Sequence, residues 1–382
     1  MGIILGIVAV LVALPPFELR QLWWPAAIGI VGTAAGIWAT TRAERRVGLI
    51  AVAVNVLGVT LGILATESST ENLNLVVVWS ALIGATLRYA TPLTFAAIGG
   101  MFSERSGVVN IGLEGDMLMG AFFAFWGTDV TGSWVLGLLI GVVAGGLLAL
   151  LHAFFCIHLR ADQIVIGTAV NFLALGLTGY LYIDIYGEQG TPTTVPGIPD
   201  VEIPGRGSLG FIGDTFGSLN LMIWLSFAVV VISYFVMFRT TIGLRIRSVG
   251  EHPRAAETVG ISVYGIRYAC VITSGALAAL GGAYLSLSDV HLFDQNLTGG
   301  RGFIALAALI FGNWRPFGAF AAALLFGFSS AIADRLDVYF VEGSQQALIF
   351  NVLPYVLTII AVAGVVGRSI PPAAVGRPYV KQ

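Results

Sequence analysis

Continuous apolar runs of about 17–25 residues recur along almost the whole chain, and they restrict its fold more than any other feature. In lipid every backbone N–H and C=O needs an internal partner, so only helices or closed barrels can span. These runs do not alternate apolar and polar residues, which favours helices. Charged residues make up 10% of the chain, against roughly a quarter in a soluble domain. The sequence therefore predicts an all-α, polytopic transmembrane helical bundle.

About 10–12 spans are predicted, including short or broken helices. The run at 302–312 is too short to cross a bilayer as a straight helix. The long run at 75–102 is expected to be broken at Arg88 and at Thr91-Pro92. The predicted segments are 1–16, 22–40, 47–65, 75–102, 108–127, 134–158, 163–183, 220–238, 266–287, 302–312, 317–333 and 346–366.

The distribution of basic residues predicts the orientation in the membrane. If both termini are cytoplasmic, most of the 19 Lys and Arg residues fall in inside segments. The loop at 239–265 is the longest and most basic of these. The Pro- and Gly-rich stretch at 184–219 then lies outside, together with 66–74, and is expected to hold little regular helix. We expect a multi-pass protein of the cell membrane with both termini in the cytoplasm.

Motifs for nucleotide, dinucleotide or metal binding are missing from the sequence. The two cysteines, Cys156 and Cys270, lie far apart, and the four histidines are scattered. No catalytic residue, cofactor, metal or nucleic-acid partner is therefore expected. Uphill transport by such a chain needs energy from another subunit or from an ion gradient.

The basic loop contains a predicted two-turn helix outside the bilayer. Pro253 suits the first helical position, where its missing N–H costs nothing, and Gly260 suits the left-handed position after the end. Gly250 is expected to be a flexible entry. So short a helix needs a surface to pack on, so the loop is either an ordinary basic loop or a docking helix for a cytosolic partner. The candidate docking residues are Gly250, Glu251, Pro253, Arg254, Ala255, Ala256, Glu257 and Gly260, with Arg254 and Glu257 spaced to pair and the two alanines presenting a small face.

This loop resembles the coupling helix of ATP-binding-cassette (ABC) importer permeases in the branch that handles branched-chain amino acids, ribose and nucleosides. Two further stretches, Phe102–Phe122 with the core SERSGVVNIGLEGDM and Gly299–Pro316 with the core GGRGFIALAALIFGN, are similar to the same branch. Together they look most like the second permease subunit of bacterial nucleoside importers. The resemblance divides the chain into N-terminal spans of unassigned role (1–70), a permease domain (71–366) and a cytoplasmic tail (367–382).

The resemblance implies a non-catalytic subunit that forms a path through the lipid membrane for a nucleoside or similar small polar solute. The implied partners are a second permease subunit, cytosolic ATP-binding subunits that hydrolyse ATP, and an extracytoplasmic substrate-binding lipoprotein. The docking residues of the 239–265 loop would then couple the ATPase to the spans.

Four polar residues at membrane depth are candidates for the translocation path: Arg88, Asn110, Glu114 and Asn171. Ionisable groups in spans usually face a bundle interior or a watery path. Glu114 and the nearby Asp116 have an alternative role as caps of a helix start, and the two asparagines as hydrogen-bonding links between helices. Arg88 is expected to have an internal partner, for which Glu114 or Asp116 is available.

Other functions stay open at this point. A sugar or a branched-chain amino acid is the nearest alternative substrate. An ion-coupled secondary transporter would need several carboxylates deep in its spans, whereas most of the 21 acidic residues fall in loops and the rest near span edges. A membrane-embedded enzyme would need a catalytic cluster, which the sequence does not show.

Overall fold

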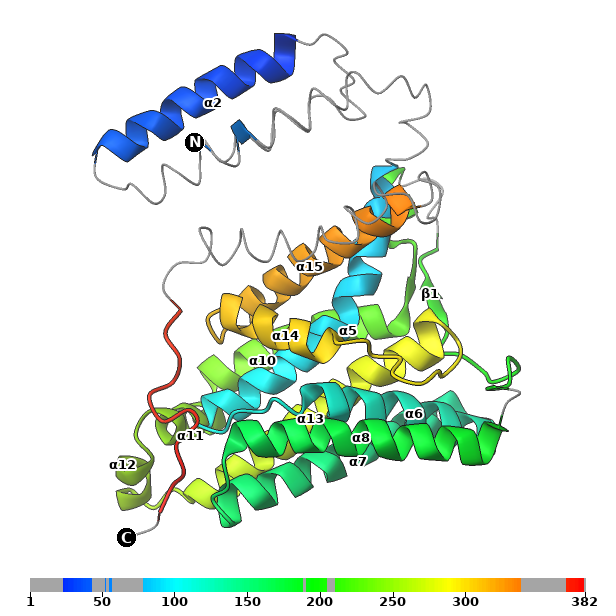
Figure 1. The fold of residues 1–382 in the computed structure, drawn as a ribbon, viewed down its shortest axis with the longest axis vertical. Helices are drawn as coiled ribbons and strands as arrows, with labels where there is room; N and C mark the ends of the chain where they lie inside the picture. The colour runs from blue at the N-terminus through cyan, green and yellow to red at the C-terminus, as the bar shows by residue number, and fades with distance from the viewer. Residues whose placement is uncertain are drawn as a thin grey trace. The chain divides into compact units, whose positions relative to one another are not determined.

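The computed structural model describes residues 23–42, 52, 55–56, 78–187, 190–204, 210–337 and 369–380. The chain divides into two compact units, Met1–Leu82 with Ile332–Gly367, and Ile83–Ala331 with Arg368–Gln382. The first unit contains α2 (Trp23–Arg42). The second, which we call the main unit, contains most of the described helices (Figure 1).

Six helices in the described part of the chain are long and apolar enough to cross a membrane. They are α5 (Trp79–Arg105), α7 (Trp134–Ala153) continued by a π-helical turn (Phe154–His158), α8 (Gln163–Tyr186), α10 (Leu221–Arg239), α13 (Val263–Tyr284) continued by a π-helical turn (Leu285–Asp289), and α15 (Pro316–Asp337). The other helices of the main unit are α6 (Leu113–Thr131), α9 (Phe211–Phe216), α11 (Thr241–Glu251), α12 (Pro253–Thr258) and α14 (Arg301–Phe311). The predicted all-α polytopic bundle is confirmed.

Two details of the predicted spans are wrong. The break expected at Arg88 and Thr91-Pro92 does not occur, because α5 runs through Pro92 as one helix of 27 residues. The Thr91 hydroxyl donates to the Leu87 carbonyl one turn earlier (2.7 Å), and such side-chain bonds and neighbouring helices let membrane helices tolerate proline. The span predicted from 108 becomes helical only at Leu113, because turns precede it.

One further predicted run is present in the structure, and several others lie outside the described residues. The short run at 302–312 is present as α14, which has 11 residues. The predicted spans at 1–16, 47–65 and 346–366 lie largely or wholly outside the described residues, as does the stretch at 66–74.

Helices α6, α7 and α13 pack against one another more extensively than any other set in the described chain. Glycines bring their backbones together. A Cβ added to Gly120 of α6 would lie 2.3 Å from the Ala279 carbonyl oxygen of α13, and one added to Gly282 of α13 would lie 1.8 Å from that of Met117 in α6. On α7, a Cβ added to Gly145 would lie 2.9 Å from the carbonyl oxygen of Gly275 in α13. Small residues at such crossings are the main means of close packing between membrane helices.

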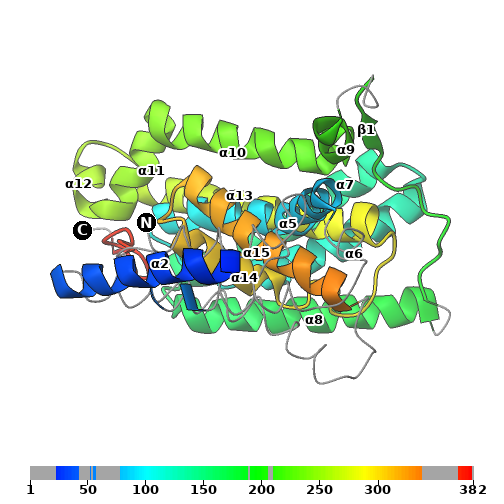
Figure 2. The ribbon, with the colours of Figure 1, turned by 90° about the horizontal axis from the view of Figure 1, so that it is seen from above.

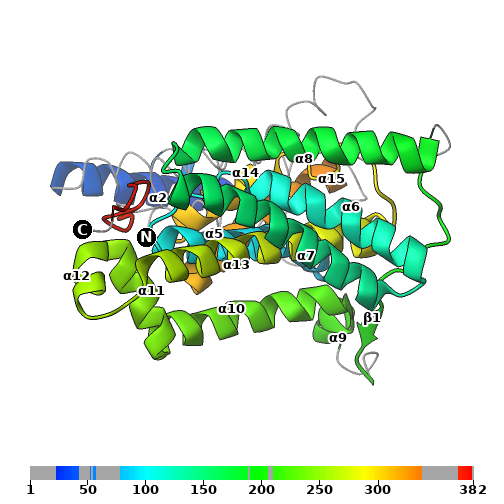
Figure 3. The ribbon, with the colours of Figure 1, turned by 90° about the horizontal axis from the view of Figure 1, so that it is seen from below.

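The main unit has two distinct ends (Figures 2 and 3). At one, which we call the hairpin end, strands β1 (Asp200–Glu202) and β2 (Ser218–Asn220) pair antiparallel beside α9. At the other, which we call the α12 end, lie α11, α12 and the C-terminal segment 369–380. The loop at 184–219 therefore has little helix in its described part, as predicted, whereas the loop at 239–265 consists mostly of two helices.

The glycine crossing gives the first prediction. Gly282→Ala should lower the thermal unfolding midpoint of the detergent-purified protein, because the new methyl would overlap the Met117 carbonyl oxygen. Overpacking of this kind costs about 1–3 kcal/mol. Fluorescence-detected size exclusion after heating measures the midpoint.

The matched control is Gly176→Ala on α8, where an added Cβ would meet nothing within 4 Å. Both changes raise helix propensity by about 1 kcal/mol, so the difference between them reports the overlap alone. Equal midpoints for the two variants would show that the α6–α13 contact does not limit stability.

Candidate functional site

The predicted docking helix is present at the α12 end as α12. Pro253 occupies its first turn, as expected, and Gly260 follows the end with a φ of 82°, in the left-handed region. A β-carbon is strained in that conformation, which explains the glycine. The sequence thus located this short helix and both of its boundary residues correctly.

Gly250 differs from its expected role as a flexible entry. It lies inside α11 and is buried. A Cβ added there would lie 2.0 Å from the carbonyl oxygen of Arg105, the last residue of α5. Gly250 is therefore the point at which α11 packs directly on the end of a membrane helix. The need for glycine is steric here and does not come from flexibility.

Helix α11 itself was missed by the sequence analysis. Thr240 caps it, since its hydroxyl accepts a hydrogen bond from the Gly243 N–H (3.2 Å). Ile246 and Val249 are buried on one side, while Ile242 and Leu244 are each 61% exposed. The signal was available: a threonine cap followed by apolar residues at helical spacing predicts such a helix.

The two alanines of α12 face in different directions. Ala256 is 3% exposed and packs in a small cluster with Val249, Val263 and Tyr379. Ala255 is exposed, as is Arg254. Val259, just after the helix, is 74% exposed. The expectation that both alanines present one small face to a partner is therefore wrong, and only Ala255 is available to it. Glu251 and Glu257 both hydrogen-bond to the C-terminal segment, Glu257 accepting from the Tyr379 hydroxyl.

Beneath α11, the end of α5 is tied to the turn between α14 and α15. The Arg105 Nε–H donates to the Trp314 carbonyl (3.0 Å), and the Trp314 indole N–H donates to the Glu104 carboxylate (2.5 Å). Arg105 and Arg247 of α11 both lie over the Phe238 ring, at 5.9 and 5.1 Å from its centroid. Glu104 and Arg105 come from one family-like motif and Trp314 from the other, so the structure joins two motifs that sequence analysis only placed in order.

Glu114 joins α6 to the start of the short helix α14. Its carboxylate accepts hydrogen bonds from the Thr298 hydroxyl (2.6 Å) and from the backbone N–H groups of Gly300 (2.7 Å) and Gly302 (2.6 Å). A carboxylate at a helix N-terminus is favoured by the unpaired N–H groups and by the helix dipole. Glu114 therefore does cap a helix, but the helix is α14 and not its own α6.

Asn110 and Asn171 both hold the first turn of α6 in place. The Asn110 amide donates to the Asp116 carboxylate (3.1 Å) and to the Ser274 hydroxyl on α13 (3.0 Å). Asn171 on α8 accepts from the Gly115 N–H (2.8 Å) and donates to a carbonyl before α6 (3.0 Å). These are the inter-helix links considered from the sequence. Asp116 is 1% exposed, and it lies in the first turn of α6, at the edge of the span as predicted.

Arg88 lies apart from these groups. Its side chain is exposed on α5, near enough to Asp289 to interact electrostatically. Among the described residues, no ion pair joins it to Glu114 or Asp116, so the pairing considered from the sequence is wrong. The reason is geometric, since the carboxylate of Glu114 is directed at the α14 N-terminus.

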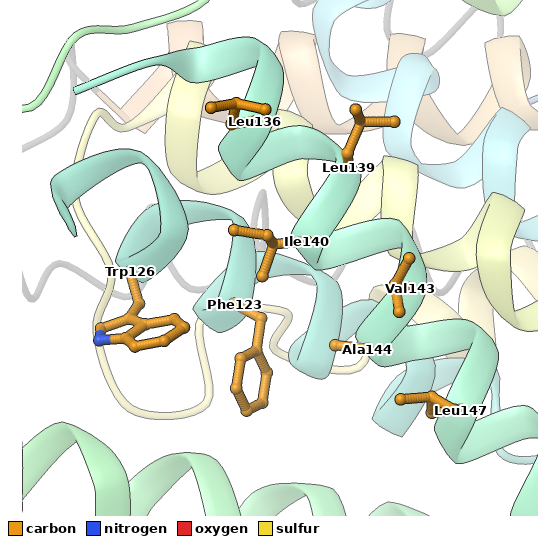
Figure 4. Close-up of a pocket in the computed structure, with 8 residues that line it drawn as sticks. All are labelled: Phe123, Trp126, Leu136, Leu139, Ile140, Val143, Ala144 and Leu147. Carbon is orange, nitrogen blue, oxygen red and sulfur yellow. The ribbon is translucent and has the colours of Figure 1, made fainter. Parts of the chain in front are cut away.

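A hollow on the outer surface of α6 and α7 does not suit a small polar solute (Figure 4). The only side-chain nitrogen or oxygen around it is that of Trp126. Polar ligands need several placed hydrogen-bonding groups. Its lining residues are Phe123, Trp126, Leu136, Leu139, Ile140, Val143, Ala144 and Leu147. A lipid-facing surface has this composition.

Apolar spanning helices, a short helix fixed in their midst and a small helix at one end together define a multi-pass membrane protein of the transporter class. The chain belongs to the family described as the permease component of branched-chain amino acid transport systems, whose model matches residues 82–362. It is a permease subunit of ABC transporters. No solved structure matches the chain.

Three relatives place it further within the family. The guanosine ABC transporter permease protein NupQ of Bacillus subtilis is 44% identical over 77% of this chain and 95% of its own length. The nucleoside ABC transporter permease protein NupC of Lactococcus lactis is 40% identical over the same shares. A putative glucose ABC transporter permease protein, TsgC13 of Haloferax volcanii, is 37% identical over 64% of this chain and 74% of its own length.

Glu114 gives the second prediction. Glu114→Gln should lower the thermal midpoint of the purified protein, and with it uptake. Glutamine has a single acceptor oxygen, so its amide nitrogen must face backbone or hydroxyl donors that Glu114 now satisfies. Leaving one buried donor unsatisfied costs about 1–3 kcal/mol.

The control for charge alone is Asp184→Asn, at an exposed position on α8. It removes one negative charge without touching the α14 N-terminus. A midpoint for Glu114→Gln as high as that of Asp184→Asn would mean that the Glu114 carboxylate does not hold α14.

Proposed function

We propose that this permease forms the translocation path for a nucleoside or a closely similar small polar solute, entering the cell at the cost of ATP hydrolysed on a separate subunit. The observation that carries the proposal is the similarity to two permeases of nucleoside or guanosine transporters, at 40% identity or more over 95% of their length. The hydrogen bonds that its polar residues at depth form between helices agree with a non-catalytic role.

We infer that the complete transporter contains the partners that the family resemblance implies. A second permease subunit would complete the path, cytosolic ATP-binding subunits would drive it, and an extracytoplasmic substrate-binding lipoprotein would deliver the solute. Basic residues favour the cytoplasm for the α12 end, where Arg245, Arg247 and Arg254 lie on two adjacent helices. The hairpin end would then face outward, toward the binding protein.

In this arrangement α12 is the element that contacts the ATPase. Its exposed residues Arg254 and Ala255, with Val259 just after the helix, form the surface available to a groove on that subunit. Its buried side packs against α11 and α13. Helix α11 packs in turn against the end of α5 at Gly250. A push on α12 would thus reach two membrane helices through direct backbone and side-chain contact.

The four path residues predicted from the sequence have two different proposed roles, one for Asn110, Glu114 and Asn171 and another for Arg88. Asn110, Glu114 and Asn171 are proposed to position α6, α8 and α14 around the path, because their hydrogen bonds join those helices. Alanine at any of the three should then reduce transport by displacing helices. Arg88, exposed on α5, is the one of the four free to meet a second subunit or a passing solute.

A sugar is the second candidate substrate, and the relative whose name contains glucose is the observation that favours it. Proteoliposomes that hold the complete transporter decide between the two. Uptake of radiolabelled guanosine should be suppressed by excess unlabelled nucleosides and left unchanged by excess glucose or leucine. ATP-dependent uptake of radiolabelled glucose or leucine, with none of radiolabelled guanosine, would reject the nucleoside proposal.

The coupling surface gives a further prediction. Ala255→Trp should yield a stably folded permease that no longer co-purifies with the ATPase, or no longer couples hydrolysis to uptake, because a large side chain on the exposed face blocks the groove. Gly260→Val should act similarly by straining the left-handed residue that ends α12. Substrate-stimulated ATPase activity and uptake, measured together in proteoliposomes, report the effect.

Two comparisons make this test specific. Ala161→Trp adds the same side chain in the turn between α7 and α8, outside α11 and α12, and should leave co-purification intact. Ala256→Trp should instead lower the thermal midpoint, because Ala256 is buried inside the protein. Wild-type hydrolysis and uptake in both Ala255→Trp and Gly260→Val would show that α12 is not the coupling element.

A further inference from the structure

The C-terminal segment 369–380 crosses the α12 end and contacts five separate parts of it. Ile370 N–H donates to the Asn313 side chain in the turn between α14 and α15 (3.1 Å). Further along, Ala374 N–H donates to the Gly250 carbonyl of α11 (2.9 Å), and Gly376 N–H donates to the Gly107 carbonyl after α5 (3.3 Å). The segment therefore bridges elements that are remote from one another in sequence.

Its last described residues are fixed by side chains as well as by backbone. Arg267 of α13 is 1% exposed, and its guanidinium donates to the Ser106 carbonyl and to the Arg377 carbonyl (3.2 Å each). That guanidinium lies 6.0 Å from the centroid of the Tyr379 ring. Burying a guanidinium is costly unless carbonyls or charges satisfy its donors, and here carbonyls satisfy the Nε and Nη1 donors. Two of the groups around Arg267, namely Arg377 and Tyr379, come from the C-terminal segment.

Tyr379 is the anchor of the segment. It is 5% exposed and packs edge-on against Tyr264 of α13, with ring centroids 5.6 Å apart. Its hydroxyl donates to the Glu257 carboxylate of α12, and its ring covers Ala256 in the same cluster. The Tyr379 side chain thus contacts α12 in two ways, by a hydrogen bond to Glu257 and by ring packing near Ala256.

The local sequence favours a fixed conformation of the C-terminal segment. Pro371, Pro372 and Pro378 restrict the backbone and reduce the entropy lost on ordering. Gly376 has a φ of 75°, which lets the chain turn between the Gly107 and Arg267 contacts. An unrestrained tail needs none of these features.

We propose that residues 369–380 form a clamp that seats α12 on the ends of α5 and α13, with Tyr379 as the residue that positions α12. A helix of six residues has too few internal hydrogen bonds to hold its own place. With the clamp closed, α12 moves together with α13. Without it, α12 tilts in the ATPase groove and the motion does not reach the membrane helices. This role rests on the proposed coupling function of α12, whereas the clamp contact itself does not.

The first experiment tests the contact without any ATPase. Ala256→Cys is introduced into the permease, and the rate at which the new thiol of the detergent-purified protein reacts with a maleimide is measured. The parent chain provides the background, since Cys156 and Cys270 are buried. Ending the chain after Arg368, or changing Tyr379→Ala, should raise the rate by about an order of magnitude, because protection of a buried group follows the free energy of local opening.

Two variants control for general damage. Tyr379→Phe retains the ring but loses the hydroxyl, so its rate should lie between those of the parent and Tyr379→Ala. Val380→Ala changes an exposed neighbour on the same segment and should have no effect. An unchanged rate in both the truncated chain and Tyr379→Ala, with thermal midpoints equal to the parent, would overturn the clamp.

The second experiment tests the consequence for transport. In proteoliposomes with the complete transporter, Tyr379→Ala should lower the solute taken up per ATP hydrolysed by several-fold while hydrolysis itself continues. A purely structural role would lower both rates together and leave their ratio unchanged, which would overturn the positioning role. If Ala255→Trp and Gly260→Val both have no effect but truncation exposes the cysteine of Ala256→Cys, the coupling function of α12 fails while the clamp contact stands.

Discussion

The close contact of α6, α7 and α13 is the interaction on which the main unit depends. Lipid tails are as apolar as the helices they surround, so helices in a membrane associate by fit rather than by withdrawal from water. Gly120 and Gly282 remove the side chains that would hold α6 and α13 apart. The first turn of α6 is fixed as a result, and Glu114 can then fix the start of α14. A short helix packed beside longer helices keeps its position through such a bond.

The same logic extends to the α12 end, where direct contacts replace flexible connections. Gly250 puts α11 against the last carbonyl of α5, and Arg105 carries the contact on to Trp314 after α14. The first joint is a close steric approach of a glycine to a backbone carbonyl. The second is a hydrogen bond from a guanidinium to a carbonyl, and losing such a partner is costly for a buried group. A force applied to α11 or α12 therefore has a continuous route to the membrane helices, which suits the coupling role proposed for α12.

The polar residues inside the bundle favour an ATP-driven permease over an ion-coupled transporter. A carboxylate that carries protons or sodium has to exchange its partner during transport. Glu114 is held by three donors at once, two of them from the backbone, and Glu104 is held by Trp314. Asp116 is linked to Asn110. These groups serve to hold helices together, which agrees with the family to which the chain belongs.

The sequence by itself determined the class of fold, the family and the ends of α12, because those follow from apolar run length, local proline and glycine preferences and motifs read along the chain. Only the tertiary structure decided that Gly250 is a packing point, that Ala256 faces inward and Ala255 outward, and that Arg88 does not meet Glu114. It also decided that Tyr379 reaches α12 across more than one hundred residues of chain. The physical reason is that burial and pairing depend on which distant segments meet, whereas spacing along one segment reports only its own helix.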